Sequence, residues 1–152
     1  MKIFRKNARC NMKVNKTLNM TMLCDFYELT MGNGYFVSGM KDQICYFDVF
    51  YRNVPDNGGF AIAAGLEQVV EYIQDLHFSA EDIEYLRGRK LFDEGFLRYL
   101  ESFRFTGDIY AVPEGTPIFP KEPILTVRAP AIEAQLIETY ILIILNHQSL
   151  IA

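Results

Sequence analysis

The sequence has no tryptophan and only three cysteines, Cys10, Cys24 and Cys45. The count is odd, and there is neither a CxxC pair nor a histidine cluster, so no disulfide framework or zinc site is indicated. Free thiols are typical of a reducing cytosol, and we expect a cytoplasmic protein. The longest apolar stretch, residues 140–145, is too short to span a bilayer. The absences exclude the disulfide-rich secreted, zinc-stabilised and membrane-spanning classes.

A strong charge of either sign is also absent. The 152 residues carry a net charge of −4, with 50% hydrophobic residues, which is typical of one ordinary globular domain and gives no reason to expect nucleic acid. The exception is residues 1–24, which hold six bases and no acid. A targeting peptide, a phosphate-seeking arm and a solvated tail all fit such a leader. Because it lacks the apolar core of a secretory signal, we favour a disordered tail over residues 1–18.

Motifs that carry chemistry are scarce, since there is no HExxH, GxSxG or Walker loop. His77 lies near a predicted helix C-terminus, where a cation favours the helix dipole. His147 lies on a helix that we expect to be buried, which favours a hydrogen-bonded structural role. Residues 57–59, Asn-Gly-Gly, precede a helix and offer backbone N–H groups to a phosphate, although a plain turn explains them as well.

The first predicted helix begins with a capping signature. Asp25 is the expected N-cap, and Glu28 stands three positions later, as in a capping box. We expect this helix to weaken at Gly32 and Gly34 and to end by Gly39. The two acids are also paired carboxylates, but capping explains both of them.

An aromatic and β-branched run over residues 44–51 predicts a strand. Its period of two places Tyr46, Asp48 and Phe50 on one face and the alternate residues on the other. Arg52 ends this strand and can hold a phosphate through its guanidinium fork, while surface solvation explains it equally well.

Further helices are predicted by apolar spacing and capping. Residues 60–76 read as a short extended piece followed by a helix. Ser79 caps the next helix, with Asp82 at its third position. A third helix covers residues 94–103, so that helices dominate the middle of the chain.

The last part of the chain mixes strands with one long helix. Residues 108–112 and 124–128 alternate like strands between proline turns, and residues 131–152 contain nothing that breaks a helix. Residues 141–145 are apolar on every side, which predicts burial by partners all round. Since no cap follows, we expect either another chain to cover this helix or the sequence to be the front of a longer protein.

Residues 23–35, Leu-Cys-Asp-Phe-Tyr-Glu-Leu-Thr-Met-Gly-Asn-Gly-Tyr, resemble the opening motif of nicotinate phosphoribosyltransferases. The likeness is collinear and covers the chain from about residue 19 to its end. The other matching stretches are residues 47–55, 58–67, 123–130, 133–139 and 146–152.

The resemblance implies a fold class and a domain order. The expected fold is the α+β N-terminal domain of a type II phosphoribosyltransferase, with helices packed on a small, mainly antiparallel sheet. This domain would occupy residues 19–130, after the leader over residues 1–18. Residues 131–152 would start the long helix that leads into an α/β barrel, which is absent from this chain.

The resemblance also implies an activity. Family members make nicotinate mononucleotide and diphosphate from nicotinate and phosphoribosyl diphosphate. ATP hydrolysis drives this step of NAD salvage, with Mg²⁺ as the expected metal, and the chemistry is that of a ligase and a glycosyltransferase. The phosphorylated histidine of the family lies in the barrel, so no catalytic residue is expected within this chain. We therefore expect the 152-residue chain to be inactive alone.

Three residues match substrate-binding positions of the family. Tyr27 matches a tyrosine that reaches the pyridine ring across a homodimer interface, and Asp25 and Arg52 match residues near that shared site. Purely structural roles stay open as alternatives: core packing for Tyr27, surface solvation for Arg52 and helix capping for Asp25. The expected partners are the two substrates and a second copy, with no nucleic acid and no membrane. The alternative function is a non-catalytic interaction module that pairs with a full-length subunit.

Overall fold

The computed structural model describes residues 2–3, 18–54 and 58–152. Within them, the main sheet has the strand order β1-β4-β6-β2, and every neighbouring pair is antiparallel. A separate small sheet pairs β3 with β5. The strands are β1 (Lys2–Ile3), β2 (Ile44–Phe50), β3 (Ala61–Ile62), β4 (Asp108–Ala111), β5 (Pro117–Ile118) and β6 (Pro123–Pro130).

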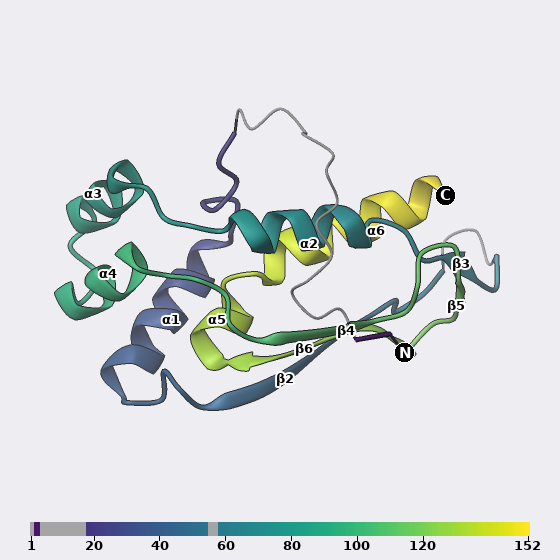
Figure 1. The fold of residues 1–152 in the computed structure, drawn as a ribbon, viewed down its shortest axis with the longest axis horizontal. Coiled ribbons are helices and arrows are strands. Elements are labelled where there is room, and N and C mark those ends of the chain that lie inside the picture. Colours follow the sequence, from purple (N-terminus) through teal and green to yellow (C-terminus); the bar gives the residue numbers. More distant parts are fainter. Residues whose placement is uncertain (1, 4–17, 55–57) are drawn as a thin grey trace.

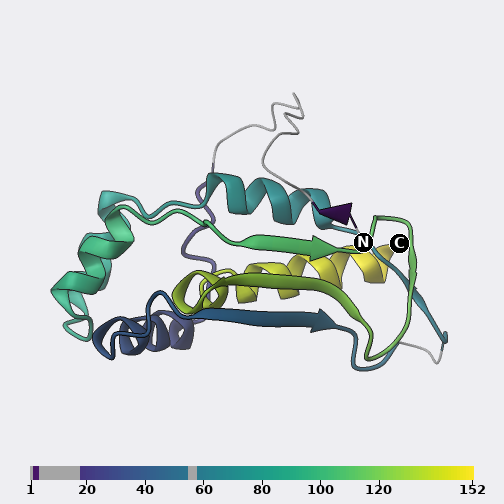
Figure 2. The ribbon, with the colours of Figure 1, turned by 60° about the horizontal axis from the view of Figure 1, so that its bottom comes forward.

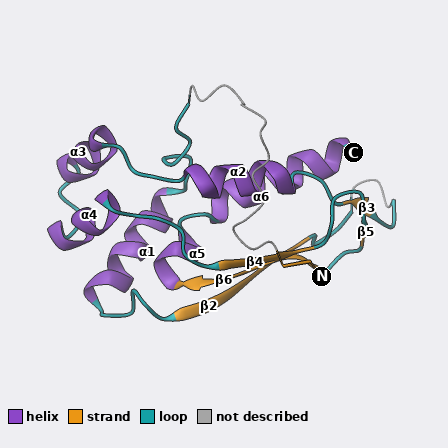
Figure 3. Ribbon diagram, viewed as in Figure 1, coloured by secondary structure: helices purple, strands orange, loops and turns teal. Residues whose placement is uncertain are grey.

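The helices form two groups around this sheet (Figures 1 and 3). At one end, α1 packs against α4 and α5, and α3 packs against α4. Along the sheet, α2 contacts α6, and Figure 2 shows α6 running beside the three longer strands. The helices are α1 (Phe26–Val37), α2 (Leu66–Asp75), α3 (Ala80–Gly88), α4 (Glu94–Glu101), α5 (Ala131–Gln135) and α6 (Glu138–Ile151).

This architecture confirms the predicted α+β class, with helices on a mainly antiparallel sheet and a long final helix. The strand β2 has the predicted faces, because its exposure alternates residue by residue from Ile44 to Phe50. The predicted capping box of α3 is also present. Ser79 Oγ accepts the Asp82 amide at 3.1 Å, and the Asp82 carboxylate accepts the Ser79 amide at 2.8 Å.

The prediction of one unbroken helix over residues 131–152 is wrong, because α5 and α6 are separated at Leu136 and Ile137. In an unbroken helix the Thr139 amide would donate to the carbonyl of Gln135. Here the Glu28 carboxylate accepts that amide at 3.0 Å. A buried acceptor from another helix therefore ends one helix and begins the next.

The prediction that partners bury α6 on every side stays a prediction, because this chain alone leaves part of the helix exposed. Ile141 and Leu145 are buried in the core, whereas Leu142 and Ile143 are 45% and 46% exposed. Within the described chain, α6 packs against α2 and β3, and it also bonds to Glu28 in its first turn and to Tyr51 at Asn146. His147 lies on α6 and is exposed in this chain, so its expected buried structural role also stays a prediction.

Some predictions fall outside the described residues. These are Cys10, most of the leader over residues 1–18, and Asn57 with most of the turn around it. Of the leader, Lys2 and Ile3 are described, as β1 beside β4. In the described ranges Cys24 and Cys45 are free thiols, and no helix there has the length and apolar character needed to cross a membrane.

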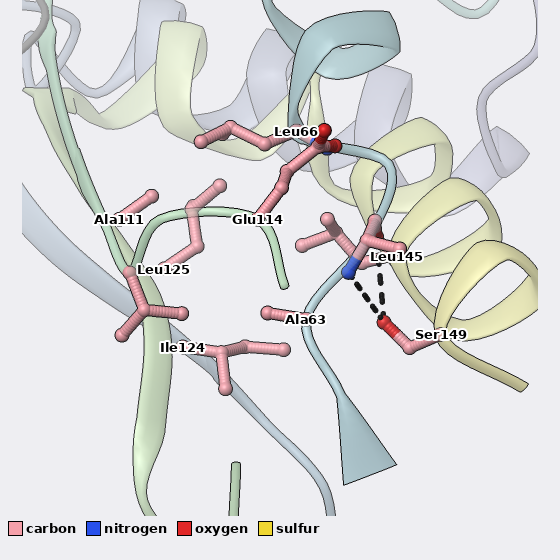
Figure 4. A pocket seen from close by; sticks show the side chains of 10 residues that line it. Ala63, Leu66, Ala111, Glu114, Ile124, Leu125, Leu145 and Ser149 are labelled. Carbon is pink, nitrogen blue, oxygen red and sulfur yellow. Dashed lines mark hydrogen bonds between the residues drawn. The ribbon is translucent and has the colours of Figure 1, made fainter. Parts of the chain in front are cut away.

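A small void lies where α2 and α6 meet the sheet (Figure 4). Its volume is about 10 Å³, which is room for a single water molecule. Ser149 Oγ accepts the Ala64 amide at 3.1 Å and donates to the Ala64 carbonyl at 3.3 Å. Beside it, the Glu114 carboxylate accepts the amides of Gly65 and Leu66 at the start of α2. These hydrogen bonds beside the void hold the residues that lead into α2 against α6 and Glu114.

Candidate functional site

The exposed aromatic ring of Tyr27 stands where the start of α1 meets the start of α6. The residue is 44% exposed, yet its hydroxyl donates to Glu138 Oε1 at 2.8 Å. The other oxygen of Glu138 accepts the side-chain amide of Gln135 at 2.7 Å. Tyr27 is therefore not an ordinary core residue, because it presents an anchored ring to solvent.

Glu28, the next residue, is fully buried and turns toward α6. Its Oε1 accepts the Thr139 amide at 3.0 Å and the Thr139 hydroxyl at 2.5 Å. The same hydroxyl accepts the backbone amide of Asp25 at 3.2 Å. Through Thr139, the residues that begin α1 are tied to the first turn of α6.

The predicted capping box at the start of α1 is wrong. Asp25 does occupy the N-cap position, but its side chain makes no cap hydrogen bond. Glu28 does not return to the Asp25 amide, because Thr139 offers it two donors in the buried interface. The expected capping role of the Asp25 carboxylate is therefore corrected, and this carboxylate is exposed beside Tyr27.

Burial and neighbouring acids perturb this site. The pKa of Glu28 is raised to about 7: burial is the largest cause, the hydrogen bonds from Thr139 oppose the rise, and the charges of Glu138 and Asp25 add to it. Partial burial, followed by the hydrogen bond to Glu138, raises the pKa of Tyr27 to about 12. The Tyr27 hydroxyl consequently keeps its proton at neutral pH and donates it to Glu138. Burial, with Glu28 next in effect, also raises the pKa of the Cys24 thiol to about 12.

Arg52 lies elsewhere, just beyond the end of β2. The preceding Tyr51 is buried, and its hydroxyl donates to the Asn146 carbonyl of α6 at 3.1 Å. Arg52 lines an open groove of about 560 Å³ between this end of β2 and α6, together with Phe50 and Leu142. Across the described ranges, no hydrogen bond or ion pair engages the Arg52 guanidinium, which leaves its fork available to an anion.

The structure brings together Asp25 and Tyr27 but not Arg52. On α6, Glu138 beside Tyr27 and Asn146 beside Tyr51 are eight positions apart. At 1.5 Å per residue this is about 12 Å along the helix. Two separate groups therefore lie beside α6: an aromatic ring among carboxylates next to its first turn, and a cation beside an apolar groove next to its second half.

Sequence reasoning missed Glu138, Gln135 and Thr139 as parts of this site. All three fall in a stretch that matches the family, but no spacing rule connects them to residues 25–28. Their link is a contact across 111 positions of the chain. As for metals, the part of the chain that is described contains no group of three or more His, Cys, Asp or Glu that could hold an ion.

Comparisons with known proteins give the wider setting. Residues 22–146 match the family described as the nicotinate phosphoribosyltransferase (NAPRTase) N-terminal domain. A nicotinate phosphoribosyltransferase of Mycobacterium tuberculosis is 44% identical over 131 residues, which are 86% of this chain and 28% of that protein. One of Bacillus subtilis is 39% identical over 134 residues, which are 88% of this chain and 27% of that protein.

Solved structures agree with these matches. The crystal structure of human nicotinic acid phosphoribosyltransferase superposes with a TM-score of 0.78 and 32% sequence identity, covering 84% of this chain and 26% of that one. A nicotinate-nucleotide pyrophosphorylase from Pyrococcus furiosus gives a TM-score of 0.61 at 19% identity, covering 91% and 28%, and shows the shared fold alone. The chain spans less than a third of the length of each of these proteins.

Proposed function

The chain belongs to the nicotinate phosphoribosyltransferase family, where it matches the N-terminal domain, and we propose that it is the N-terminal part of such an enzyme. The complete enzyme would convert nicotinate and phosphoribosyl diphosphate into nicotinate mononucleotide and diphosphate. ATP hydrolysis would drive this step of NAD salvage. Since the chain covers less than a third of its relatives, this activity belongs to a longer protein, and the 152 residues alone are inactive.

The observation that carries the proposal is the anchored, exposed ring of Tyr27. A planar pyridine base binds well against an aromatic face. In the reaction, the ring nitrogen of nicotinate forms a bond to the ribose C1 while the bond from C1 to diphosphate breaks. A ring held at one angle presents the base to C1 in one orientation, which lowers the entropic part of the barrier.

Arg52 and Asp25 have supporting tasks. The Arg52 fork matches two oxygens of a phosphate, and its position beside an open groove lets a substrate phosphate reach it. The exposed carboxylate of Asp25 stands two residues from Tyr27 and can accept hydroxyl protons of the ribose. Within one chain these two residues lie beside different parts of α6: Asp25 bonds to Thr139 in its first turn, and Tyr51, next to Arg52, bonds to Asn146. We propose a homodimer in which two copies of the chain share one active site.

The cofactors are ATP and Mg²⁺, and their sites are assigned to the part of the enzyme beyond this chain. The described residues do not fit a magnesium centre, since they provide no cluster of three or more suitable ligands. No step is therefore routed through a metal here. We place the enzyme in the cytoplasm, in keeping with its free thiols.

Sequencing the source transcript through and beyond codon 152 is the first test. The expected result is a reading frame that continues for the length of a barrel domain. The full-length protein should then release diphosphate when nicotinate is added, and Tyr27→Ala should raise the KM for nicotinate. A stop codon directly after Ala152, or diphosphate release by the purified 152-residue chain, contradicts the proposal.

A second candidate function follows from the apolar side of α6, where Leu142, Ile143 and Leu150 are exposed. A chain of this length could use that side to pair with a complete subunit as a non-catalytic module. Co-expression with a full-length family member distinguishes the two functions. Only the module forms a stable mixed complex in which this chain ends at residue 152.

A further inference from the structure

We infer that Glu138 is the positioning residue of Tyr27, and that Gln135 holds Glu138 in place for this task. The inference rests on the proposed contact between Tyr27 and the nicotinate ring. It adds residues from the α5–α6 junction to a site that the sequence connects only with the start of α1.

The geometry places two adjacent bonds between the helices. Tyr27 bonds to Glu138 at 2.8 Å, and Glu28 bonds to Thr139 at 3.0 and 2.5 Å. Consecutive residues of α1 therefore contact consecutive residues of α6. The Glu28 pair is buried and fixes the backbones, while the Tyr27 pair lies at the surface and fixes a side chain.

Tyr27 needs such a support because the residue is nearly half exposed. An exposed tyrosine exchanges between rotamers, and binding a ligand then costs the free energy of ordering the ring. The bond to Glu138 orders the ring before the ligand arrives. It persists at neutral pH, because the Tyr27 hydroxyl keeps its proton up to a pKa of about 12.

Gln135 makes Glu138 suitable for this role. The side chain of Gln135 is only 3% exposed, and its amide donates to Glu138 Oε2 at 2.7 Å. A buried donor thus fixes one oxygen of Glu138 and leaves the other to accept from Tyr27. The break between α5 and α6 puts these two residues on either side of one tight turn.

The test measures both the ring and the kinetics. In the 152-residue chain labelled with ring-¹³C tyrosine, Tyr27→Phe assigns the Tyr27 resonance. Glu138→Ala should move this resonance. The matched control Glu81→Ala, which removes an exposed acid in the first turn of α3, should leave it in place.

In the full-length enzyme, Glu138→Ala and Tyr27→Phe should each raise the KM for nicotinate about three- to tenfold, as expected for one lost hydrogen bond. The kcat of these variants should change by less than about twofold. Glu138→Gln should restore most of the affinity for nicotinate, because glutamine keeps an acceptor oxygen. The double variant, Tyr27→Phe with Glu138→Ala, should have a KM for nicotinate no higher than that of either single variant.

Each outcome separates this inference from the proposed function. If Tyr27→Ala raises the KM for nicotinate but Glu138→Ala changes neither the resonance nor the KM, the positioning role is wrong and the proposed function stands. If Glu138→Ala lowers kcat and the melting temperature together and Glu138→Gln does not rescue it, the role is structural only. If Tyr27→Ala itself has no effect on nicotinate, the proposed function fails and the inference fails with it.

Discussion

Glu28 and Thr139 stand 111 residues apart in the chain and share two hydrogen bonds in a buried interface. Glu28 Oε1 takes both the amide and the hydroxyl of Thr139, while Glu28 Oε2 is buried without a partner among the described residues. The negative charge lies at the N-terminus of α6, where the helix dipole favours it. One side chain thus joins two helices and determines where the second one starts.

The pH dependence of stability should reveal this buried acid. The pKa of Glu28 rises from an ordinary 4.5 to about 7 on folding, so the folded chain binds the extra proton between these values. Its contribution to stability is therefore full below about pH 4.5 and is lost as the pH rises through 7. The free energy of unfolding should fall by roughly 2–3 kcal/mol relative to Glu28→Gln between pH 5 and pH 8, since one pKa unit is worth about 1.4 kcal/mol. Urea titrations of both proteins at several pH values measure this difference.

Glu81→Gln is the matched control for that experiment, because Glu81 is exposed and starts another helix. It should keep the pH profile of the wild type. A Glu28→Gln profile that runs parallel to the wild type would show that Glu28 ionises normally.

Thr139→Val should destabilise the chain by about 1–3 kcal/mol. The valine keeps the shape but removes the hydroxyl that links Glu28 with the Asp25 amide, and it leaves a buried acceptor with one donor fewer. Thr116→Val is the control, since the Thr116 side chain has no hydrogen bond in the described structure, and it should stay within about 0.5 kcal/mol of the wild type. Equal losses in the two variants would contradict the role of the hydroxyl.

Alanine substitutions at two glycines of α1 should change the stability of the chain in opposite directions. A Cβ on Gly32 would lie 3.3 Å from the ring of Phe96, which is fully buried and cannot yield easily. A Cβ on Gly34 would meet open space. Gly34→Ala should stabilise the chain by about 0.5–1 kcal/mol through helix propensity, and Gly32→Ala should destabilise it by a similar or larger amount through overpacking. Thermal melts of the two variants check this, and a stabilising Gly32→Ala would show that Phe96 can move.

The apolar side of α6 should govern self-association of the isolated chain. The double variant Leu142→Lys with Leu150→Lys should increase the monomer fraction, because it removes contiguous apolar surface without touching the core. Light scattering after size-exclusion chromatography measures the effect. Leu91→Lys is the control, since Leu91 is also exposed but lies between α3 and α4. If Leu91→Lys reduces association as strongly, added charge alone explains the result.

Substitution of Arg52 should change the KM for only one of the two substrates. In the full-length enzyme, Arg52→Gln should raise the KM for phosphoribosyl diphosphate about tenfold, because a charge-assisted hydrogen bond to phosphate is lost. The KM for nicotinate should not change, because the phosphate that we assign to Arg52 belongs to the other substrate. Arg98→Gln, on the exposed side of α4, is the control. A rise in the nicotinate KM instead would place Arg52 near the base.

Local sequence patterns predicted a helix or strand correctly where all the residues that form the pattern lie within that one element. The Ser79–Asp82 capping box spans three residues of one turn, and both of its bonds are present. The alternating exposure of β2 follows from the pleat alone. In both cases no distant residue competes for the same groups.

The same reasoning failed where a distant partner was the stronger one. Asp25 and Glu28 have the spacing of a capping box, but Thr139 offers Glu28 two donors in a buried place. That contact also explains the unpredicted break between α5 and α6. For the candidate site, resemblance supplied Tyr27, Asp25 and Arg52, whereas Glu138 and Gln135 became visible only through the fold.

The pairing of β2 with β6 has a consequence for how this protein is made. Residues 44–50 bond to residues 123–130 along their whole length, so β2 leaves the ribosome well before its partner has been translated. At roughly 5–20 residues per second, the aromatic strand waits several seconds with an open edge. The emerging chain is therefore most exposed to misassembly and to chaperones during this interval, and slow codons between residues 50 and 123 would lengthen it.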